Sequence, residues 1–329
     1  MTNYDLEIFA NTIYFLQIYR PCAITKLSFS HLIIKSITPP SGPEHYHHKT
    51  KLQSYQNEKT FYEKYAHFYA EYCKIPTFHF SYLNESDDND IDRNDENDKL
   101  DEIKLVLEDL VAYGTPKNLP NKTWLEWNQV KKIISWLAGF HAKGLILVSE
   151  GNYNSSDLWQ RGTYWNLPSR QHNHKNMPES DLKKIASDID MKLVNSKFHT
   201  IIHGDSKLPN FMVNDEFTKI SGFDFQWTGK GCGLQDVYYL LTSCYKLEIG
   251  EETDRVLPFY FEELEKYLGG KFDRQKFEEL VTDWSGLWSF IVADFERMIR
   301  SWLPQEKMPA YKLTNYSEFH VKKVIQLLK

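Results

Sequence analysis

Residues 201–213, IIHGDSKLPNFMV, carry the strongest chemical signal in this chain. Two short apolar runs, each typical of a buried strand, flank a polar turn that contains His203 and Asp205. Asn210 follows Asp205 by five positions, just before the second apolar run. One tight turn between two strands can present Asp205 and Asn210 to the same cleft. Transfer of a phosphoryl group needs a carboxylate that orients the acceptor hydroxyl and oxygen ligands that hold magnesium nearby, and this segment offers both.

A second carboxylate lies at the end of another short strand. Residues 220–226, ISGFDFQ, form an apolar run that leads into Asp224. Because one hairpin separates this run from Asn210, both side chains can approach the same cation. A carboxylate in such a position can bridge magnesium to the phosphates of a nucleotide.

Together these segments resemble the aminoglycoside-phosphotransferase and choline-kinase group, and most closely its ecdysteroid-kinase-like branch. The resemblance covers nearly the whole chain and is specific because several motifs occur in the order that the group has. These motifs are the strand LIIK (32–35), the helix NEKTFYEKYA (57–66), the connector LVLEDL (105–110) with YG (113–114), the helix LAGFHAKG (137–144), and the loops IIHGDSKLPNFMV (201–213) and FDFQWTGKGCGLQDVYYL (223–240). The resemblance implies an α+β, protein-kinase-like fold with two lobes, the first small and rich in strands and the second larger and helical.

The resemblance also implies roles for the residues of the two loops. Asp205 would be the base that orients the acceptor hydroxyl, while Asn210 and Asp224 would hold Mg²⁺ against ATP. His203 would brace the loop and would not transfer protons. Lys207 follows Asp205 by two positions, a spacing that protein kinases also use for a phosphate-contacting lysine; a surface lysine is the alternative. The expected activity is ATP-dependent phosphorylation of a hydroxyl group on a small molecule.

The first third of the chain supplies candidates for nucleotide binding. Lys35 ends an apolar strand, where its ammonium could reach the α and β phosphates, and Glu58 is the natural partner that would hold it there. Lys26 and Glu63 are rivals on the same elements, although the alternating pattern around Lys26 favours a position that faces solvent.

The connector between the lobes contains Glu108, Asp109 and Leu110. In the fold that the resemblance implies, backbone groups at this point usually meet the edge of the adenine ring. We therefore expect Glu108 and Leu110 to lie beside the nucleotide. The carboxylates of Glu108 and Asp109 are better explained as caps or ion-pair partners. Asp236, which follows two glycines at the start of a predicted helix, is expected to cap that helix and to support the catalytic loop.

The pattern of apolar residues changes from strands to helices along the chain. Strands are expected within residues 23–37, 77–82 and 103–107. Helices are expected at residues 52–73, 124–143, 182–196, 235–245, 257–268, 274–303 and 317–328. This order predicts a nucleotide-binding lobe at 1–108 with an acidic flexible loop at 84–102, a connector at 109–115, and a catalytic and acceptor lobe at 116–329.

Two features depart from the kinase pattern. No glycine-rich phosphate loop precedes Lys35, and the only candidate turn lies near residues 20–21. Gln226 replaces the glycine that protein kinases have after their metal-binding motif, so a flip of the loop like theirs is less expected. Neither departure removes a catalytic group.

The bulk composition excludes several classes of function. Hydrophobic residues make up 41% of the chain and charged residues 26%, which is typical of a globular protein. The net charge of −6 gives no basic surface for a nucleic acid. The four cysteines form no C-x-x-C pair and suit reduced thiols, and no long apolar run occurs. We expect a cytoplasmic protein without a membrane span.

The sequence leaves the acceptor and the oligomeric state open: amino alcohols, sterol-like alcohols and sugars all suit the site. Aromatic and aliphatic residues recur at helical spacing from Trp284 to Trp302, and this stripe could line an acceptor pocket or pack in the core. The alternative function is a catalytically silent, nucleotide-binding pseudokinase, against which the presence of Asp205, Asn210 and Asp224 argues. A protein kinase is disfavoured because no Ala-Pro-Glu signature follows the metal-binding loop.

Overall fold

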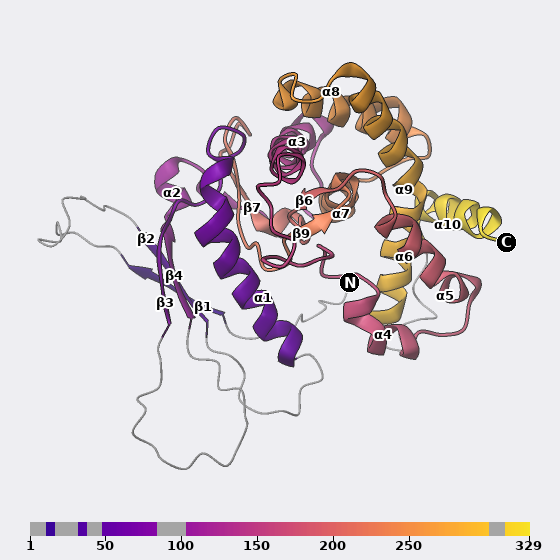
Figure 1. Ribbon diagram of the computed structural model, residues 1–329, viewed down its shortest axis with the longest axis horizontal. Coiled ribbons are helices and arrows are strands. Elements are labelled where there is room, and N and C mark those ends of the chain that lie inside the picture. The colour runs from indigo at the N-terminus through magenta and orange to yellow at the C-terminus, as the bar shows by residue number, and fades with distance from the viewer. Residues whose placement is uncertain (1–10, 17–31, 38–47, 84–102, 303–312) are drawn as a thin grey trace, which may run out of the picture.

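The computed structural model describes residues 11–16, 32–37, 48–83, 103–302 and 313–329. Strands and helices are segregated along the chain, with an antiparallel sheet from the first third lying beside a larger, mostly helical part (Figure 1). The helix α1 (His48–Thr60) runs between the sheet and the helical part. This arrangement confirms the expected α+β fold with a small strand-rich lobe and a larger helical lobe.

The N-terminal sheet is antiparallel throughout and has the strand order β1 (Asn11–Leu16), β2 (Leu32–Ile37), β4 (Ile103–Glu108) and β3 (Phe78–Leu83). Strands β3 and β4 occupy the predicted segments, whereas β1 is not signalled by the sequence pattern. Within β2, Lys35 is opposite Ile13 on one side and Leu105 on the other. Hydrogen-bonded strands on both sides therefore fix the backbone of Lys35.

Helix α1 continues into less regular helical turns. Residues Phe61–Tyr65 form a π-helical turn and Ala66–Tyr69 a 3-10 turn, so the helix expected here is not uniformly α. Large aromatic side chains from both turns are buried, and Phe61 packs on Phe225 with ring centroids 4.3 Å apart. π-turns are frequent at functional sites. The contact joins this segment to the residue that follows Asp224.

The core of the helical lobe is α3 (Trp127–Ser149), which has apolar residues on nearly every side. A helix that is apolar all round is buried, and α3 packs against α7 (Gly233–Cys244), α8 (Leu257–Leu268) and β6 (Thr200–Ile202). Helices α9 (Arg274–Trp302) and α10 (Asn315–Leu327) complete the lobe and pack on each other. These helices lie in the segments that the sequence pattern predicts.

The segment between α3 and β6 is more broken than the pattern predicts. In place of one helix over 182–196, the chain forms α5 (Asp181–Lys184) and α6 (Ala186–Val194), and it adds α4 (Gln171–Asn176) before them. The break lies at Ile185, whose backbone leaves the α-helical region (φ −92°, ψ 7°). An isoleucine carries no helix-stop signal, so the break has no signature in the sequence.

Short strands frame the two polar loops. Strand β6 pairs with β9 (Gly229–Gly231), and β7 (Phe211–Val213) pairs with β8 (Ile220–Gly222) and with β5 (Lys117–Asn118). Strands β6 and β7 are the two apolar runs expected on either side of the His203–Asn210 turn. The polar loops therefore begin and end on hydrogen-bonded backbone.

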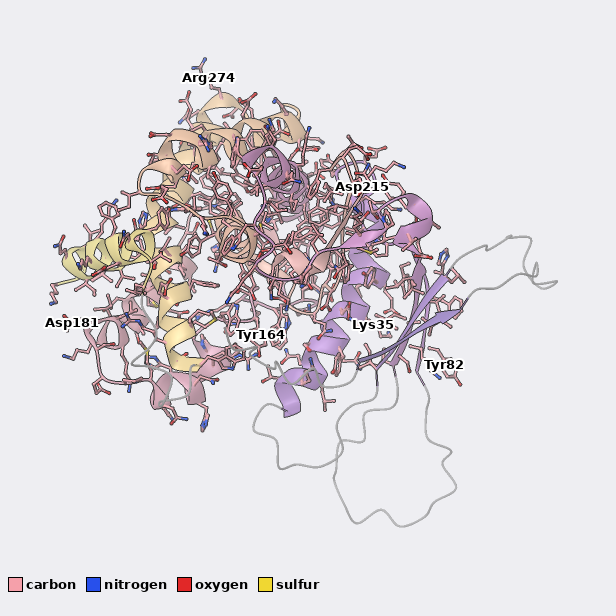
Figure 2. All side chains as sticks on the ribbon, turned by 180° about the vertical axis from the view of Figure 1, so that it is seen from behind. Lys35, Tyr82, Tyr164, Asp181, Asp215 and Arg274 are labelled. Carbon is pink, nitrogen blue, oxygen red and sulfur yellow. The ribbon has the colours of Figure 1, made fainter. Side chains whose placement is uncertain are left out.

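Several predicted features lie outside the described residues: Lys26, the turn near residues 20–21 and the acidic segment 84–102. Within the described ranges, no helix has both the length and the apolar character needed to cross a bilayer. Figure 2 shows Lys35 and Tyr164 lying toward the region between the sheet and the helical lobe, whereas Asp181 and Arg274 lie at the outer ends of the helical lobe.

Candidate active site

The turn between β6 and β7 requires a glycine at position 204. Gly204 has φ +81°, a left-handed conformation that residues with a Cβ atom rarely adopt. A Cβ atom there would lie 2.1 Å from the carbonyl oxygen of Trp227 and 2.7 Å from the amide nitrogen of Thr163. Steric exclusion therefore accounts for the glycine of the His-Gly-Asp sequence and fixes the backbone just before Asp205.

Asp236, near the start of α7, holds this turn in place. Its buried carboxylate accepts hydrogen bonds from the backbone nitrogens of His203 (2.6 Å) and Gly204 (2.9 Å), and it lies 3.0 Å from Nε2 of His141. Burial alone would raise the pKa of Asp236, but the bonds from His141 and the loop outweigh it and lower the pKa. These contacts agree with the expectation that Asp236 supports the loop. The expectation that Asp236 caps α7 is wrong, because the side chain of Gln235 makes the capping contact of that helix.

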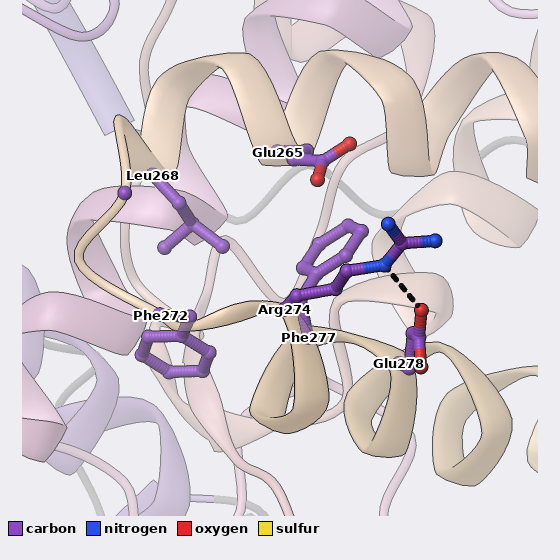
Figure 3. A pocket seen from close by; sticks show the side chains of 7 residues that line it. Glu265, Leu268, Phe272, Arg274, Phe277 and Glu278 are labelled. Atoms are coloured by element: carbon purple, nitrogen blue, oxygen red, sulfur yellow. Dashed lines mark hydrogen bonds and ion pairs between the residues drawn. The ribbon is translucent and has the colours of Figure 1, made fainter.

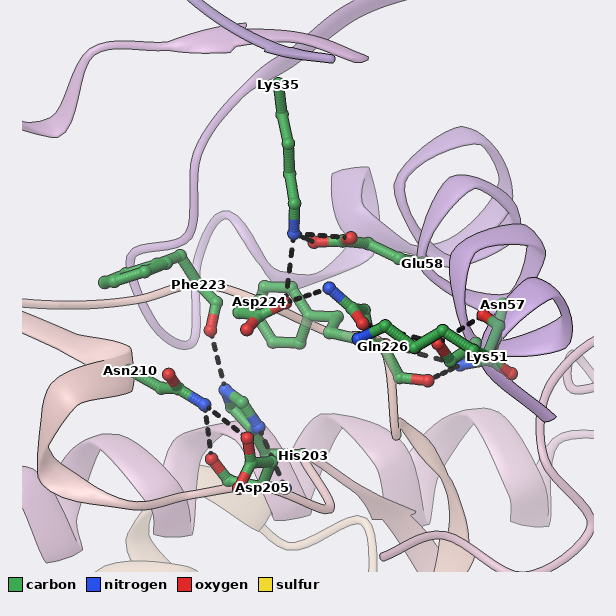
Figure 4. Close-up of polar contacts among 12 residues, drawn as sticks. Lys35, Lys51, Asn57, Glu58, His203, Asp205, Asn210, Phe223, Asp224 and Gln226 are labelled. Atoms are coloured by element: carbon green, nitrogen blue, oxygen red, sulfur yellow. Dashed lines mark hydrogen bonds and ion pairs between the residues drawn. The ribbon is translucent and has the colours of Figure 1, made fainter. Parts of the chain in front are cut away.

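Asp205, Lys207 and Asn210 form one polar cluster inside the turn. Nδ2 of Asn210 donates to the backbone oxygen of Asp205 (2.6 Å) and to its Oδ2 (3.0 Å), and Nζ of Lys207 lies 2.9 Å from the same Oδ2. Burial lowers the pKa of Lys207, but the nearby carboxylate of Asp205 has the larger effect, so the pKa of the lysine is raised. Because its amide nitrogen faces Asp205, Asn210 directs Oδ1 away from that carboxylate (Figure 4).

His203 connects the turn to the segment that precedes Asp224. Its ring is fully buried, Nε2 donates to the carbonyl of Phe223 (3.0 Å), and Nδ1 accepts from the backbone nitrogen of Asp205 (3.3 Å). Both ring nitrogens are therefore used by backbone groups. This geometry suits a bracing residue and leaves neither nitrogen for a proton transfer.

Asp224 combines an unusual backbone conformation with partial exposure. Its φ of +67° lies in the left-handed region, which residues other than glycine seldom occupy and which is enriched at functional sites. Oδ1 accepts from Nζ of Lys35 (3.0 Å) and from Nε2 of Gln226 (2.9 Å). Burial would raise the pKa of Asp224, but Lys35 outweighs it and lowers the pKa. The side chain is 28% exposed and so faces an opening.

Lys35 reaches Asp224 from the opposite side, together with Glu58 of α1. Its Nζ lies 3.0 and 2.8 Å from the two carboxylate oxygens of Glu58, which is 1% exposed (Figure 4). Burial opposes the charge on Lys35, but the two carboxylates outweigh it and raise its pKa. Burial raises the pKa of Glu58, which Lys35 only partly offsets. The rival acid Glu63 instead pairs with Lys59 at 2.8 Å.

Asn57 and Ser54 attach α1 to the loop that follows Asp224. Nδ2 of the buried Asn57 donates to the carbonyls of three loop residues, Phe225 (3.3 Å), Gln226 (3.3 Å) and Thr228 (2.9 Å). Its Oδ1 accepts from the backbone nitrogen of Trp159 (2.8 Å). Oγ of Ser54 donates to Oε1 of Gln226 (3.3 Å). Neither Asn57 nor Ser54 is found by sequence reasoning, because their partners are distant in the chain.

The connector residues are engaged within the protein. Glu108 forms an ion pair with Lys74 (2.5 Å) and accepts from the backbone nitrogen and hydroxyl of Thr77, which together outweigh burial and lower its pKa. Asp109 caps α2 (Leu110–Tyr113) by accepting from the backbone nitrogen of Val111 (2.9 Å). The carboxylates of Glu108 and Asp109 are therefore an ion-pair partner and a cap, as the sequence suggests, and Leu110 is buried.

Two oxygen atoms of this cluster suit a magnesium ion. The hydrogen bonds of Asp224 go to Oδ1 and those of Asn210 come from Nδ2, so Oδ2 of Asp224 and Oδ1 of Asn210 receive no hydrogen bond from the described residues. In the same part of the chain, no group of three His, Cys, Asp or Glu side chains could hold a metal. Magnesium bound with a nucleotide typically takes one or two protein oxygens and completes its shell with phosphate and water. The residues present fit that ion.

The predicted stripe on α9 divides into core and partly exposed residues. Trp284 and Trp288 are 0% and 2% exposed, and Nε1 of Trp288 donates to the hydroxyl of Tyr316 (2.6 Å). Packing in the core is therefore the right interpretation for both, and the acceptor-pocket interpretation is wrong for them. Phe295, farther along α9, lines a small pocket of about 30 Å³.

That small pocket also contains Tyr239 and Trp165, which sequence reasoning misses. Burial is the main reason that the pKa of Tyr239 is raised, and the charge and hydrogen bond of Asp205 add to it. The Tyr239 hydroxyl is therefore next to the Asp205 carboxylate. The available signal is that Tyr239 follows Asp236 by three positions, so both lie on one face of α7.

A larger pocket, of about 400 Å³, lies between the end of α8 and the start of α9 (Figure 3). It is lined by Leu268, Phe272 and Phe277 with charged groups at its rim, where Nε of Arg274 donates to Glu278 (2.9 Å). None of Lys35, Asp205 and Asp224 lines it.

Residues 170–270 match the model of the Ecdysteroid kinase-like family. The matched segment contains the His203–Asn210 turn, Asp224 and Asp236, which are the residues that the helical lobe contributes to the cluster. The resemblance to the ecdysteroid-kinase-like branch that the sequence predicts is thereby confirmed for this segment.

No curated protein sequence matches the chain. Similar solved structures include an aminoglycoside-3'-phosphotransferase of type VIII (11% identity, TM-score 0.40, covering 77% of this chain and 85% of that one). They also include an amicoumacin kinase in complex with AMP-PNP, Ca²⁺ and Ami (11%, 0.45, 90% and 80%) and an ethanolamine kinase of Plasmodium vivax (10%, 0.39, 94% and 81%). Likenesses as distant as these do not bear on the substrate.

Proposed function

We propose that this protein is an ATP- and Mg²⁺-dependent kinase that phosphorylates a hydroxyl group of a small molecule. The observation that carries the proposal is the gathering of Lys35, Glu58, Asp205, Asn210 and Asp224 from separate segments into one partly open cluster (Figure 4). A lysine shared by two carboxylates, beside two oxygens available to a cation, is the arrangement that phosphoryl transfer requires. The family match of residues 170–270 supports the same class of chemistry.

In this proposal the nucleotide lies between the sheet and the helical lobe. Lys35 binds the α and β phosphates, and Glu58 keeps its ammonium in position. Asn210 and Asp224 would hold Mg²⁺, which would supply positive charge to offset that of the phosphates. The backbone at Glu108 and Leu110 lies beside the adenine ring, which is consistent with a Glu108 side chain already engaged by Lys74.

Asp205 orients the acceptor and receives its proton. The acceptor hydroxyl donates a hydrogen bond to the Asp205 carboxylate, which aims the hydroxyl oxygen at the γ-phosphorus of ATP. As the new O–P bond forms, the bond to the β–γ bridging oxygen breaks, the hydroxyl proton passes to Asp205, and ADP leaves. Lys207 contacts Oδ2 of Asp205 in the free protein and moves to the transferred phosphoryl group, whose charge it stabilises. His203 keeps the turn in place through its two backbone contacts.

The acceptor is a small-molecule alcohol, such as an amino alcohol, a sterol-like alcohol or a sugar. It enters beside Tyr239 and Trp165, because Tyr239 is next to Asp205 and shares a small pocket with Trp165. The buried free thiols of Cys73, Cys232 and Cys244 support action in a reducing compartment such as the cytoplasm.

The test is ADP release from ATP and Mg²⁺ in the presence of a panel of alcohols, compared between the wild-type protein and Asp205→Asn. We expect at least one alcohol to stimulate ADP release, and Asp205→Asn to lower that rate by about 10²–10⁴-fold, the usual contribution of a general base. The dissociation constant of AMP-PNP should stay within about twofold, because the base is not needed to bind the nucleotide.

Two results would contradict the assignment. An Asp205→Asn variant that keeps its activity would remove Asp205 from the role of base. A wild-type protein that binds AMP-PNP and releases no ADP with any alcohol of the panel would instead favour the silent pseudokinase.

A further inference from the structure

Lys51 lies on the face of α1 that meets the candidate active site. Residues at helical spacing share this face: Lys51, Ser54, Tyr55 and Glu58. Glu58, at the far end of the face, bonds Lys35, and Ser54, in the middle, bonds Gln226. Lys51 is one turn before Ser54, and its side chain extends from α1 toward the same loop (Figure 4). The helix therefore presents a lysine to the site from a direction that Lys35 does not cover.

Lys51 differs from the other lysines of the site in having no carboxylate partner among the described residues. Lys35 and Lys207 are each held by carboxylates at 3.0 Å or less. Among the residues that the structure describes, no carboxylate lies within 4.0 Å of the Lys51 ammonium, which contacts the ring of Tyr55 at 5.0 Å. A cation in this state can accept an anionic ligand without first breaking an ion pair.

The electrostatic surroundings of Lys51 are those of the nucleotide site. Burial and the ammonium of Lys35 lower the pKa of Lys51, and the carboxylates of Asp224, Glu58 and Asp205 only partly offset them. Asp224 has the largest effect among the carboxylates. Lys51 is thus close to Asp224, and the negative charges around it do not balance the effect of burial on its ammonium. A bound anion would supply the missing negative charge.

The connection before Lys35 cannot form a glycine-rich cradle. The first glycine of the chain is Gly42, so residues 17–31, between β1 and β2, contain none. In protein kinases a glycine-rich loop in this place covers the phosphates. Glycine is the residue that lets a backbone approach phosphate oxygens most closely, so a side-chain cation is the natural replacement where the sequence has none.

We propose that Lys51 binds the terminal phosphates of the nucleotide, taking over part of the task that a glycine-rich loop performs in protein kinases. This inference rests on the proposed function and adds to it a source of selectivity for the triphosphate. Lys51 approaches from the side of Asp224 and Gln226, where the β and γ phosphates meet the metal ligands. It should therefore distinguish ATP from ADP, and contribute nothing to the binding of AMP.

The test compares Lys51→Met with wild type in calorimetric titrations of AMP-PNP, ADP and AMP in the presence of Mg²⁺. We expect the dissociation constant of AMP-PNP to rise by about tenfold or more, as for the loss of one charge-assisted hydrogen bond, with a smaller rise for ADP and no change for AMP. Lys51→Arg should restore most of the affinity for AMP-PNP. Lys59→Met is the matched control, because it removes a lysine of the same helix that pairs with Glu63.

The outcomes separate this inference from the function on which it rests. If wild type binds AMP-PNP and Lys51→Met binds it equally well, only the role of Lys51 is overturned. An equal loss for all three nucleotides, or a loss matched by Lys59→Met, would also overturn it, because such a loss reflects the helix and not the phosphates. If wild type binds no AMP-PNP, the proposed function and this inference both fail.

Discussion

Lys35 is the residue at which the sheet, α1 and the loop of Asp224 meet. Its ammonium is shared by Glu58 and Asp224, and the ion pair with Glu58 is buried. A buried ion pair contributes little net stability, but removing one partner is costly because the other charge is left without compensation. The ion pair between Lys35 and Glu58 therefore affects both the stability of the fold and the proposed binding of the nucleotide. Substitutions can separate these two effects.

Substitution of Lys35 by methionine is expected to destabilise the protein by about 3–5 kcal/mol, because Glu58 would be left buried without its cation. AMP-PNP binding should be lost with it. The double variant Lys35→Met/Glu58→Gln should recover much of the stability and none of the binding. Urea unfolding and calorimetric titration measure the two effects. If the double variant binds AMP-PNP like wild type, Lys35 has no role in holding the phosphates.

The residues of the site differ in how far the sequence reveals them. Asp205, Asn210 and Asp224 lie in short polar turns between apolar runs, so local pattern alone marks them as candidates. Lys51 and Tyr239 have no such signature, since each is an ordinary position on a helix until the partner of that helix face is known. Which face meets the site depends on contacts between distant segments, and one sequence does not contain that information.

At the scale of elements, the attachment of α1 to the loop after Asp224 is the contact that positions the site. Asn57 supplies both a donor and an acceptor, and its partners are all backbone groups. Backbone carbonyls buried without a hydrogen bond are costly, so this one side chain stabilises the loop conformation. The left-handed Asp224 lies immediately before the carbonyls that Asn57 holds.

Replacement of Asn57 by alanine is expected to lower the free energy of unfolding by about 2–4 kcal/mol, because several buried backbone groups would lose their partner. The affinity for AMP-PNP should also fall, since Lys35 and Asp224 would no longer be held in register. Ser54→Ala is the milder control, because it removes one side-chain bond to the loop, that to Gln226, and one bond within α1, that to the carbonyl of Lys51. A variant as stable as wild type would show that water replaces Asn57 without loss.

At the scale of the whole molecule, Asp236 connects three parts of the helical lobe. It lies on α7, holds the turn after β6, and contacts His141 of α3. His141 in turn contacts the hydroxyl of Tyr260 on α8 (2.9 Å). The His203–Asn210 turn is therefore attached to the central helices, and global stability should depend on the charge of the Asp236 carboxylate.

The pH dependence of unfolding follows from the lowered pKa of Asp236. A carboxyl group whose pKa is lower in the folded state stabilises the fold fully above its ordinary value of 3.8, and this contribution is lost as the pH falls through the lower folded value. Wild type should be more stable than Asp236→Asn near neutral pH. The difference in unfolding free energy between the two proteins should shrink as the pH falls below 3.8. A difference that does not change with pH would contradict this.

The order of strands and helices was predictable because long periodic segments carry strong signals, as in α3, α8 and α9. Shorter features were not. Strand β1 has apolar and polar residues mixed without clear turn signals, and the break at Ile185 depends on tertiary packing against α9 and α10 and not on a local stop residue. The stripe on α9 could be seen in the sequence, but its division into core and pocket depends on which neighbours cover each turn.

The hydrogen bonds of Asn57 also determine which inhibitors this protein would accept. In protein kinases the helix that carries the lysine-pairing glutamate must be in place for activity, and a compound can bind a state in which this helix has moved outward. Here that movement would break the contacts between Asn57 and the loop after Asp224, together with its contact to Trp159. For each 1.4 kcal/mol or so that is needed to displace the helix, the affinity of such a compound falls about tenfold. Screening against this protein should therefore favour molecules that occupy the inward arrangement.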